Sequence, residues 1–294
     1  MIFAAQLVFA GICVGAVYAL IALGLNLTFW ATRTMNFAQG SLMMLCAVIA
    51  VGVLSGGFNI YLGLFAGLAL TGIIAAATEA IAIRPIAHLT GSMGWVVTTL
   101  GVGIFLQGFV SKFFGSQALA FPSFLFSARD YVSVFGIRLS AQYMIILAIA
   151  VLLVLLFELF LKRTAWGRAL QAVAADQDLA AVMGIPVRVV VTLSFIASGV
   201  LAGVAGVLVA QITGTVDAAF GFNLLISGFV AAVIGGMGST WGALLGGIFL
   251  GIMEKLVGGY ISTAAEQGIA FALLMVMLAV RPEGLLGEKE FVKV

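Results

Sequence analysis

Long apolar runs, separated by short polar stretches, follow one another along the whole chain. The runs cover residues 3–29, 36–54, 60–83, 92–111, 141–161, 189–213, 222–257 and 266–280. A bilayer core about 30 Å thick takes about 20 apolar residues of helix to cross. The pattern therefore predicts an all-α integral membrane protein, a polytopic bundle of about eight or nine transmembrane helices.

Glycine interrupts one of these runs and recurs at a helical spacing in the others. The run at 222–257 is broken near 235–240, where the sequence reads GGMGST. This stretch is either two spans or one span followed by a re-entrant half-helix. Pairs of glycines four residues apart let membrane helices approach closely. They predict tight packing at Gly11/Gly15, Gly63/Gly67, Gly199/Gly203, Gly238/Gly242, Gly242/Gly246 and Gly247/Gly251.

The composition agrees with a membrane protein and excludes several kinds of binding site. The hydrophobic fraction is 64% and the charged fraction 8%, against about 25% charged residues in soluble domains. Residues 1–294 are therefore interpreted as a single transmembrane domain. A net charge of +2 gives no reason to expect nucleic acid. Two cysteines in apolar runs, Cys13 and Cys46, and one histidine, His88, predict no metal site and no disulfide framework.

Basic residues predict which loops lie in the cytoplasm, because short cytoplasmic loops carry an excess of Lys and Arg. With the polar stretch 162–188 placed inside, nine basic residues lie inside and four outside. Those inside are Arg33, Arg84, Lys162, Arg163, Arg168, Arg188, Arg281, Lys289 and Lys293, and those outside are Lys112, Arg129, Arg138 and Lys255. With nine spans the N-terminus lies outside and the C-terminus inside; with eight, one end changes side.

The chain lacks the residues that would supply its own driving force. No Lys follows a Gly, so the phosphate-binding loop of an ATPase is absent. Four of the acidic residues near the apolar runs, Glu158, Asp217, Glu254 and Glu266, fall at predicted span ends. Only Glu79 lies within a span, and Arg84 or a neighbouring helix is its expected structural partner. We therefore expect neither an enzyme nor a proton-coupled transporter.

The polar stretch 162–188 is expected to be a cytoplasmic loop that contains a short capped helix. Asp176 is placed to cap its start, Asp178 lies in its first turn, Gly184 fits the position after its end, and Pro186 prevents continuation. Its exposed face is expected to be small and apolar, formed by Ala180, Ala181, Met183 and Ile185. Two uses remain open: insertion into a groove on another protein, or lying on the bilayer.

The second span opens with polar residues. Asn36, Gln39 and Ser41 lie at the start of an otherwise apolar run, and buried polar groups in membrane proteins usually face the bundle interior. One hypothesis is that Asn36 and Gln39 line or gate a route through the membrane. The alternative is that Asn36 and Ser41 cap a helix and hydrogen-bond between helices.

The longest external segment predicted is 112–140. Its part 131–139 alternates as a short strand or hairpin does, and Lys112, Arg129 and Arg138 give it a basic bias. It is either a docking surface for an external partner or a structural plug held by Phe121, Phe124 and Phe126.

Several segments in order along the chain resemble the signatures of branched-chain amino acid ABC transporter permeases. They are GLNLTF at 24–29, MNFAQGSLMM at 35–44, GRALQA at 167–172, AAVMGI at 180–185, VIGGMGSTWGA at 233–243 and RPEGLLG at 281–287. One departure is Gln39, where members of the family usually have His.

The resemblance implies a permease subunit of an ABC importer for a small polar solute. The known solutes of the wider family are branched-chain and related amino acids, amides, urea and small organic acids. The expected partners are two ATP-binding subunits inside, a second permease chain, identical or related, and an external solute-binding protein. ATP would be bound by partner subunits, with no cofactor in this chain. Residues 162–188 would hold the ATPase-coupling residues Asp176, Asp178, Ala180, Met183 and Gly184. The location would be a bacterial or archaeal cytoplasmic membrane. The alternative is an autonomous secondary transporter or channel.

Overall fold

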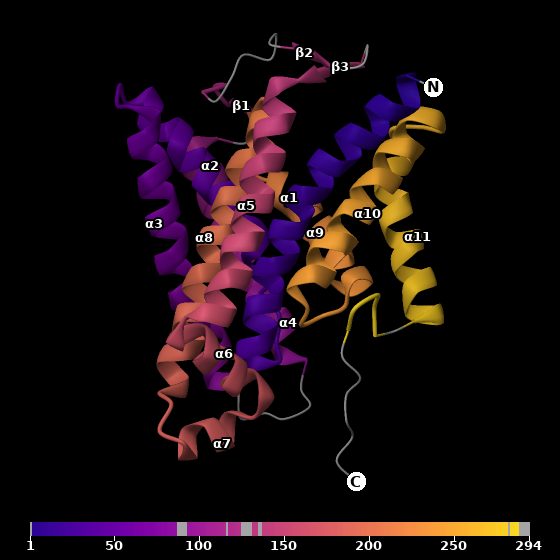
Figure 1. Ribbon diagram of the computed structural model, residues 1–294. Coiled ribbons are helices and arrows are strands. Elements are labelled where there is room, and N and C mark those ends of the chain that lie inside the picture. Colours follow the sequence, from indigo (N-terminus) through magenta and orange to yellow (C-terminus); the bar gives the residue numbers. More distant parts are fainter. Residues whose placement is uncertain are drawn as a thin grey trace.

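Nine apolar helices make up most of the protein. The computed structural model (Figure 1) describes residues 2–86, 93–115, 117–124, 131–134, 137–281 and 283–287. The nine in these ranges are α1 (Ile2–Thr32), α2 (Gln39–Ser55), α3 (Ile60–Thr78), α4 (Gly94–Phe114), α5 (Ala141–Arg163), α8 (Val187–Thr213), α9 (Phe220–Gly235), α10 (Thr240–Tyr260) and α11 (Ala265–Val280). Six are long and apolar enough to cross a membrane, and α2, α9 and α11 are shorter. The predicted all-α membrane bundle is confirmed.

Short elements lie at the two ends of the bundle. At one end are α6 (Ala165–Ala175) and α7 (Gln177–Val182), together with the π-helix η1 (Glu79–Ile83) and the 3₁₀ turn η2 (Arg84–Ile86). At the other, β1 (Leu119–Ala120) pairs antiparallel with β4 (Thr215–Val216). The strands β2 (Tyr131–Val134) and β3 (Ile137–Ser140) also pair antiparallel. This pairing confirms the hairpin predicted over 131–139. Phe126 and Arg129, named above, lie outside the described residues, as does His88.

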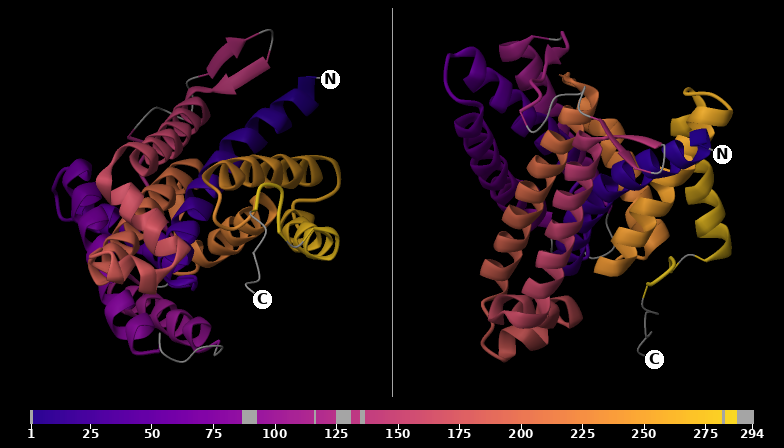
Figure 2. Two further views of the ribbon diagram at one scale, coloured as in Figure 1. Left: turned by 60° about the horizontal axis from the view of Figure 1, so that its bottom comes forward. Right: turned by 45° about the horizontal axis from the view of Figure 1, so that its top comes forward.

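The helix α1 is the centre of the bundle. It packs on α10, α8, α9 and α5, and each of its residues 16–23 is buried. Lipid tails are as apolar as these side chains, so close van der Waals packing, not removal from water, holds such helices together. In Figure 1, α1 crosses the bundle diagonally, and Figure 2 shows α3 and α11 at opposite edges.

Glycine pairs bring the helix backbones into contact, as predicted. Gly11 and Gly15 of α1 face Gly247 and Gly251 of α10, where a Cβ added to Gly251 would lie 2.4 Å from the Gly11 carbonyl oxygen. A Cβ added to Gly199 of α8 would lie 2.7 Å from a carbonyl oxygen of α3. Side chains as small as alanine do not fit at these contacts, so the sequence positions of the glycines fix which helix faces meet.

The break in the seventh apolar run joins two antiparallel helices, α9 and α10. Gly236 and Gly238 in the turn have φ of 100° and 93°, which residues with a Cβ rarely adopt. From α1, the Trp30 indole nitrogen donates to the Gly238 carbonyl at 2.9 Å. From the C-terminal side, the Leu285 and Leu286 amides donate to the Ile234 and Gly235 carbonyls at 2.8 and 2.9 Å. The last carbonyls of α9 are thus satisfied by the segment that follows α11.

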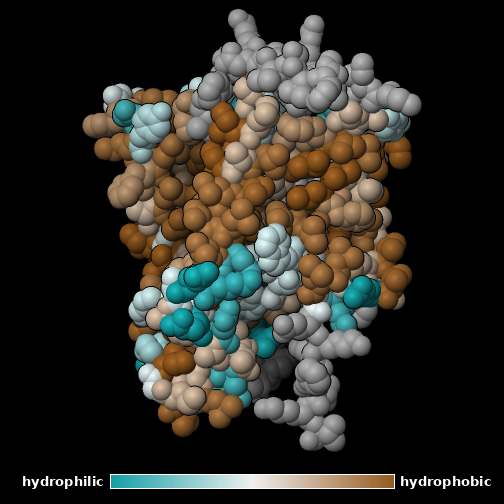
Figure 3. Space-filling model, viewed as in Figure 1, coloured by the Kyte–Doolittle hydropathy of each residue, from teal (hydrophilic) through white to brown (hydrophobic). Residues whose placement is uncertain are grey.

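The space-filling view shows how the surface divides along the bundle axis. Over the middle of the molecule the visible face is apolar (Figure 3). Hydrophilic side chains gather below it, over the end of α5 and over α6, where Lys162, Arg163 and Arg168 are exposed. The helix α1 begins at the end away from α6 and α7, and α11 finishes on the side where they lie (Figure 1). The start of α1 and the end of α11 therefore lie at opposite ends of the bundle, the arrangement expected for nine spans.

Candidate transport and coupling sites

The start of α2 lies deep inside the bundle. The Gln39 side chain is fully buried, and its Nε2 donates to the Ile21 carbonyl of α1 at 3.0 Å. Ser198 of α8 lies 3.5 Å from the Gln39 Oε1 atom. Ile21 is about 16 Å of helix from the end of α1, and Ser198 is about as far from the start of α8, at 1.5 Å per residue. Gln39 is therefore about halfway through an apolar layer of about 30 Å.

Asn36 precedes the helix and does not open it as predicted. The chain leaves α1 at Arg33, whose φ is 54°, and residues 33–38 are not helical. Asn36 is fully buried, and its Oδ1 accepts from the Ala38 amide at 3.0 Å. Non-helical backbone at this depth is tolerated only where protein or a water-filled cavity satisfies it.

Ser41 completes the polar group at the start of α2. Its hydroxyl donates to the Gly103 carbonyl of α4 at 2.9 Å. The structure thus brings Asn36, Gln39 and Ser41 together. Asn36 bonds within the turn before α2, and Gln39 and Ser41 bond to neighbouring helices. The interhelical bond of Ser41 belongs to the structural alternative stated above, but neither Asn36 nor Ser41 caps α2. Lining of a transport route by Asn36 and Gln39 stays a prediction.

An aromatic cluster lies beside this polar group, and it did not stand out in the sequence. The Phe37 ring stacks on the Trp95 ring of α4, with 5.9 Å between the ring centroids. It also packs at a tilted angle against the Phe229 ring of α9, again with 5.9 Å between centroids. All three side chains are only partly buried. Three residues from distant parts of the chain meet here, so only the fold reveals the cluster.

The helix α7 has both ends defined by specific bonds. The Asp176 carboxylate accepts from the Asp178 and Leu179 amides at 3.0 Å each, which confirms the predicted N-cap. Gly184 has φ of 82°. Its amide donates to the Ala181 carbonyl, and that of Ile185 to the Ala180 carbonyl, each at 3.0 Å. This pair of bonds is the Schellman arrangement, so the predicted glycine stop is confirmed.

The face that α7 exposes differs from the expected one. Ala180 is 4% exposed and packs in the cluster that includes Val190 and Phe195 of α8, so the prediction of an exposed Ala180 is wrong. Ala181 and Met183 are exposed as expected, Met183 at 82%. Leu179 and Val182, which the prediction did not include, are 60% and 87% exposed. A six-residue helix shows too short an apolar pattern to indicate which side faces the bundle. Gln177 also ties α7 to α1, donating to the Ala31 carbonyl at 2.6 Å.

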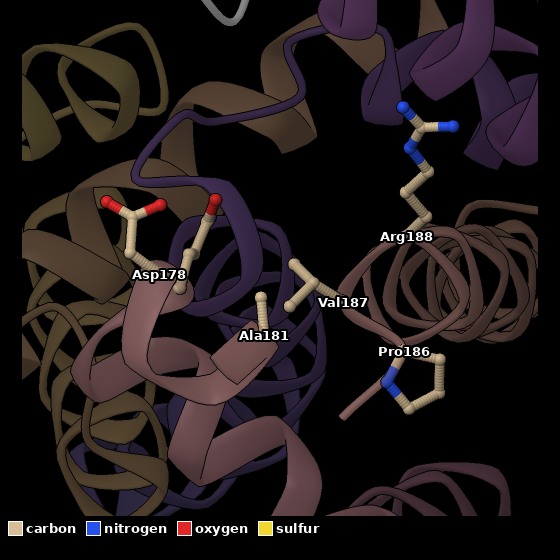
Figure 4. Close-up of a pocket in the computed structure, with 6 residues that line it drawn as sticks. Asp178, Ala181, Pro186, Val187 and Arg188 are labelled. Carbon is tan, nitrogen blue, oxygen red and sulfur yellow. The ribbon is translucent and has the colours of Figure 1, made fainter. Parts of the chain in front are cut away.

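An open hollow of about 500 Å³ separates α7 from the start of α8. Its lining includes the apolar residues Ala181, Pro186 and Val187. Asp178 and Arg188 carry opposite charges and stand on opposite sides of it (Figure 4). A partner surface that enters this hollow would meet apolar side chains together with a carboxylate and a guanidinium group.

The carboxylate at Glu79 has the partner that was predicted for it. Arg84 binds Glu79 through two nitrogens, at 2.7 and 3.1 Å, and the Thr192 hydroxyl of α8 donates to the same carboxylate at 3.0 Å. Glu79 is 3% exposed and opens the π-helix η1. The contacts join η1 and η2, which follow α3, to α8.

Glu254 corrects another prediction. It is 5% exposed and lies inside α10, not at a solvated end. The Ser227 hydroxyl of α9 donates to its Oε1 at 3.2 Å. The apolar run 222–257 does not show where α9 ends and α10 begins. The sequence therefore does not indicate how deeply Glu254 is buried. The next residue, Lys255, pairs with Glu266 of α11 at 3.1 Å.

These features define a polytopic membrane protein with a buried polar group at the start of α2 and an exposed apolar tip on α7. Residues 7–280 match the family described as "Branched-chain amino acid transport system / permease component". The chain belongs to this family, which confirms the resemblance seen in its signatures.

Relatives of known name cover almost the whole chain. The high-affinity branched-chain amino acid transport system permease protein LivH of Escherichia coli K12 is 33% identical over 98% of this chain and 97% of its own length. The permease protein BraD of Pseudomonas aeruginosa is 33% identical, with coverage of 97% and 96%. The solved structure of PsaBC from Streptococcus pneumoniae matches with a TM-score of 0.51 over 96% of this chain and 92% of that one. At 16% identity, this last match shows similarity of fold alone.

Proposed function

We propose that this chain is the permease subunit of an ABC importer that moves a branched-chain amino acid, or a closely related small polar solute, across a bacterial or archaeal cytoplasmic membrane. ATP is bound and hydrolysed by two partner subunits on the side of α7, so the chain needs no cofactor and catalyses no reaction. A second permease chain completes the membrane path, and an external binding protein delivers the solute. The names of LivH and BraD support the choice of solute.

The observation that carries the proposal is the exposed apolar tip of α7. Isolated helices of this length are unstable in water, yet α7 is fixed by its caps and by Ala180 and Gln177. Its outer side still shows Leu179, Val182 and Met183, and apolar side chains reappear at the lower tip of the molecule, below the hydrophilic zone (Figure 3). Exposed apolar patches rimmed by polar residues mark interaction sites. We assign this tip to the ATPase contact.

Replacing Gly184 by valine tests the assignment. A β-branched side chain is strained at a positive φ by about 1–2 kcal/mol, so the end of α7 and the position of Met183 should change. We expect stimulation of ATP hydrolysis by the loaded binding protein to fall by about tenfold, the factor that corresponds to 1.4 kcal/mol. The assembled importer should still be isolated intact.

A matched control is Gly214→Val. Gly214 has φ of 68°, and a Cβ added there, as at Gly184, meets no heavy atom within 4 Å. Gly214 follows α8 at the end of the bundle away from α7. Its substitution brings the same kind of strain and should leave the stimulation of hydrolysis near the wild-type level. Equal stimulation in both variants, at the wild-type value, would mean that α7 does not couple to an ATPase.

A further inference from the structure

Among the residues that the structure describes, one buried side-chain donor, on Asn36, has no hydrogen-bond partner. The Asn36 side chain is fully buried, and its Nδ2 atom finds no acceptor in the described part of the chain. The Oδ1 atom of the same amide is occupied by the Ala38 amide at 3.0 Å. Buried polar atoms in native proteins are nearly always paired, with protein, water or a ligand. An unpaired donor at this depth therefore indicates a group that is absent from the chain itself.

The donor lies at the N-terminus of a long helix. Ala38 is the N-cap of the 17-residue helix α2 and supplies no side-chain cap, and the first turn contains no acidic residue. A helix N-terminus carries about half a positive charge and several unpaired amides. Because Oδ1 of Asn36 is bound to the N-cap amide, its Nδ2 atom is held beside this positive end.

A second helix begins at the same place. The backbones of Gly40 and Gly221 touch: a Cβ added to Gly40 would lie 2.7 Å from the Gly221 carbonyl oxygen. Gly221 is in the first turn of α9, which also lacks a side-chain cap at Ala219 and an acidic residue in its first turn. Asp217 serves the approach to α9, since its Oδ1 accepts from the Ala219 amide at 2.8 Å. In the turn before α2, the residue that accepts the N-cap amide is the neutral Asn36, so no carboxylate offsets the positive end of that helix.

An apolar surface adjoins this positive site. Phe37, next to Asn36, contacts Trp95 and Phe229, and the three rings are partly exposed. A molecule that reaches Asn36 along Phe37 meets aromatic rings first and hydrogen-bond donors at the end. This order of surfaces suits a solute with an anionic head and an aliphatic body.

We infer that the start of α2 binds the carboxylate of the transported solute, with Nδ2 of Asn36 as the donor beside the positive end of the helix. The aliphatic side chain of the solute lies on Phe37, Trp95 and Phe229. Half-helices that begin inside a membrane protein place their positive ends on anionic groups of substrates in the same way. The inference rests on the proposed function and adds to it the atom that binds the carboxylate of the solute.

The test uses the complete importer, with its binding protein and ATPase subunits, in proteoliposomes. Asn36→Asp keeps the acceptor for the Ala38 amide but replaces the free donor by a carboxylate oxygen that repels an anion. Leucine taken up per ATP hydrolysed should fall at least about tenfold, the factor for one lost charge-assisted hydrogen bond. Stimulation of hydrolysis by the loaded binding protein should persist within about twofold, because α7 is unchanged.

Two further variants make the result decisive. Asn36→Ala removes the donor without adding charge, should lower uptake per ATP in the same direction, and replaces Asn36→Asp if that variant does not assemble. Ser194→Ala removes a buried hydroxyl that donates only within its own helix, to the Val190 carbonyl at 2.8 Å, and should match the wild type in both readouts.

Each outcome has a definite meaning. If the wild type takes up leucine with ATP and both Asn36 variants do so with unchanged uptake per ATP, Nδ2 is satisfied by a bound water only and the carboxylate site is overturned. If the assembled wild type takes up no branched-chain amino acid at all, the proposed function fails and the inference falls with it.

Discussion

Alanine in place of Gly251 should destabilise the bundle severely, although it adds only one methyl group. The added Cβ would lie 2.4 Å from the Gly11 carbonyl oxygen and 2.5 Å from the Gly15 amide nitrogen. Both atoms are backbone, so no rotamer change relieves the contact, and α1 must move away from α10. Overpacking usually costs about 1–3 kcal/mol, and we expect the upper end of that range. The free energy of unfolding in detergent micelles measures it.

Gly101→Ala is the matched control for this prediction. Gly101 is also inside a membrane helix, α4, but a Cβ added there meets no heavy atom within 4 Å. Alanine favours helix over glycine by about 1 kcal/mol, so this variant should be as stable as the wild type or more so. Were both variants to unfold at the wild-type midpoint, the close contact of α1 with α10 would be wrong.

The second large effect is expected at α7. The double substitution of Val182 and Met183 by aspartate places two carboxylates on the apolar tip of α7. The native side chains there are 87% and 82% exposed. Exposed substitutions change folding stability by about 0.5 kcal/mol or less, so the permease should fold. Each buried apolar side chain is worth about 1.5–3 kcal/mol, so losing two should weaken ATPase binding by at least about a hundredfold. Co-purification of the ATPase with the permease, followed across a dilution series, is the measurement.

A control for the α7 variant is Ile261→Asp. Ile261 is 75% exposed and follows α10 at the end of the bundle away from α7. It should leave ATPase binding unchanged. Retention of the ATPase by the double aspartate variant at wild-type dilution would assign the apolar tip to another surface, such as the bilayer.

The features that the sequence predicts well are those that depend on a few neighbouring residues. Apolar runs of membrane length indicate spans because the bilayer sets one length for all of them. Gly184 and Pro186 mark the end of α7 by their backbone chemistry, and Glu79 has Arg84 within reach five residues on. In each case the pattern and the structural cause lie in the same short segment.

The features that the sequence does not predict depend on which distant segments meet. Ala180 is buried because α8 passes beside it, and Glu254 because α9 and α1 enclose it. Asn36 lies before the helix because Arg33 turns the chain at the end of α1. The bonds of Leu285 and Leu286 to the end of α9 join residues about 50 positions apart. No local pattern of apolar and polar residues predicts these contacts between distant segments.

The most direct test of the account is solute uptake by the reconstituted importer. The permease chains, the two ATPase subunits and the external binding protein are placed in proteoliposomes, and labelled leucine uptake is measured with and without ATP. The account predicts uptake that requires ATP, the ATPase subunits and the binding protein together, and that persists when ion gradients are collapsed. Uptake by the permease alone, driven by an ion gradient and indifferent to ATP, would contradict it.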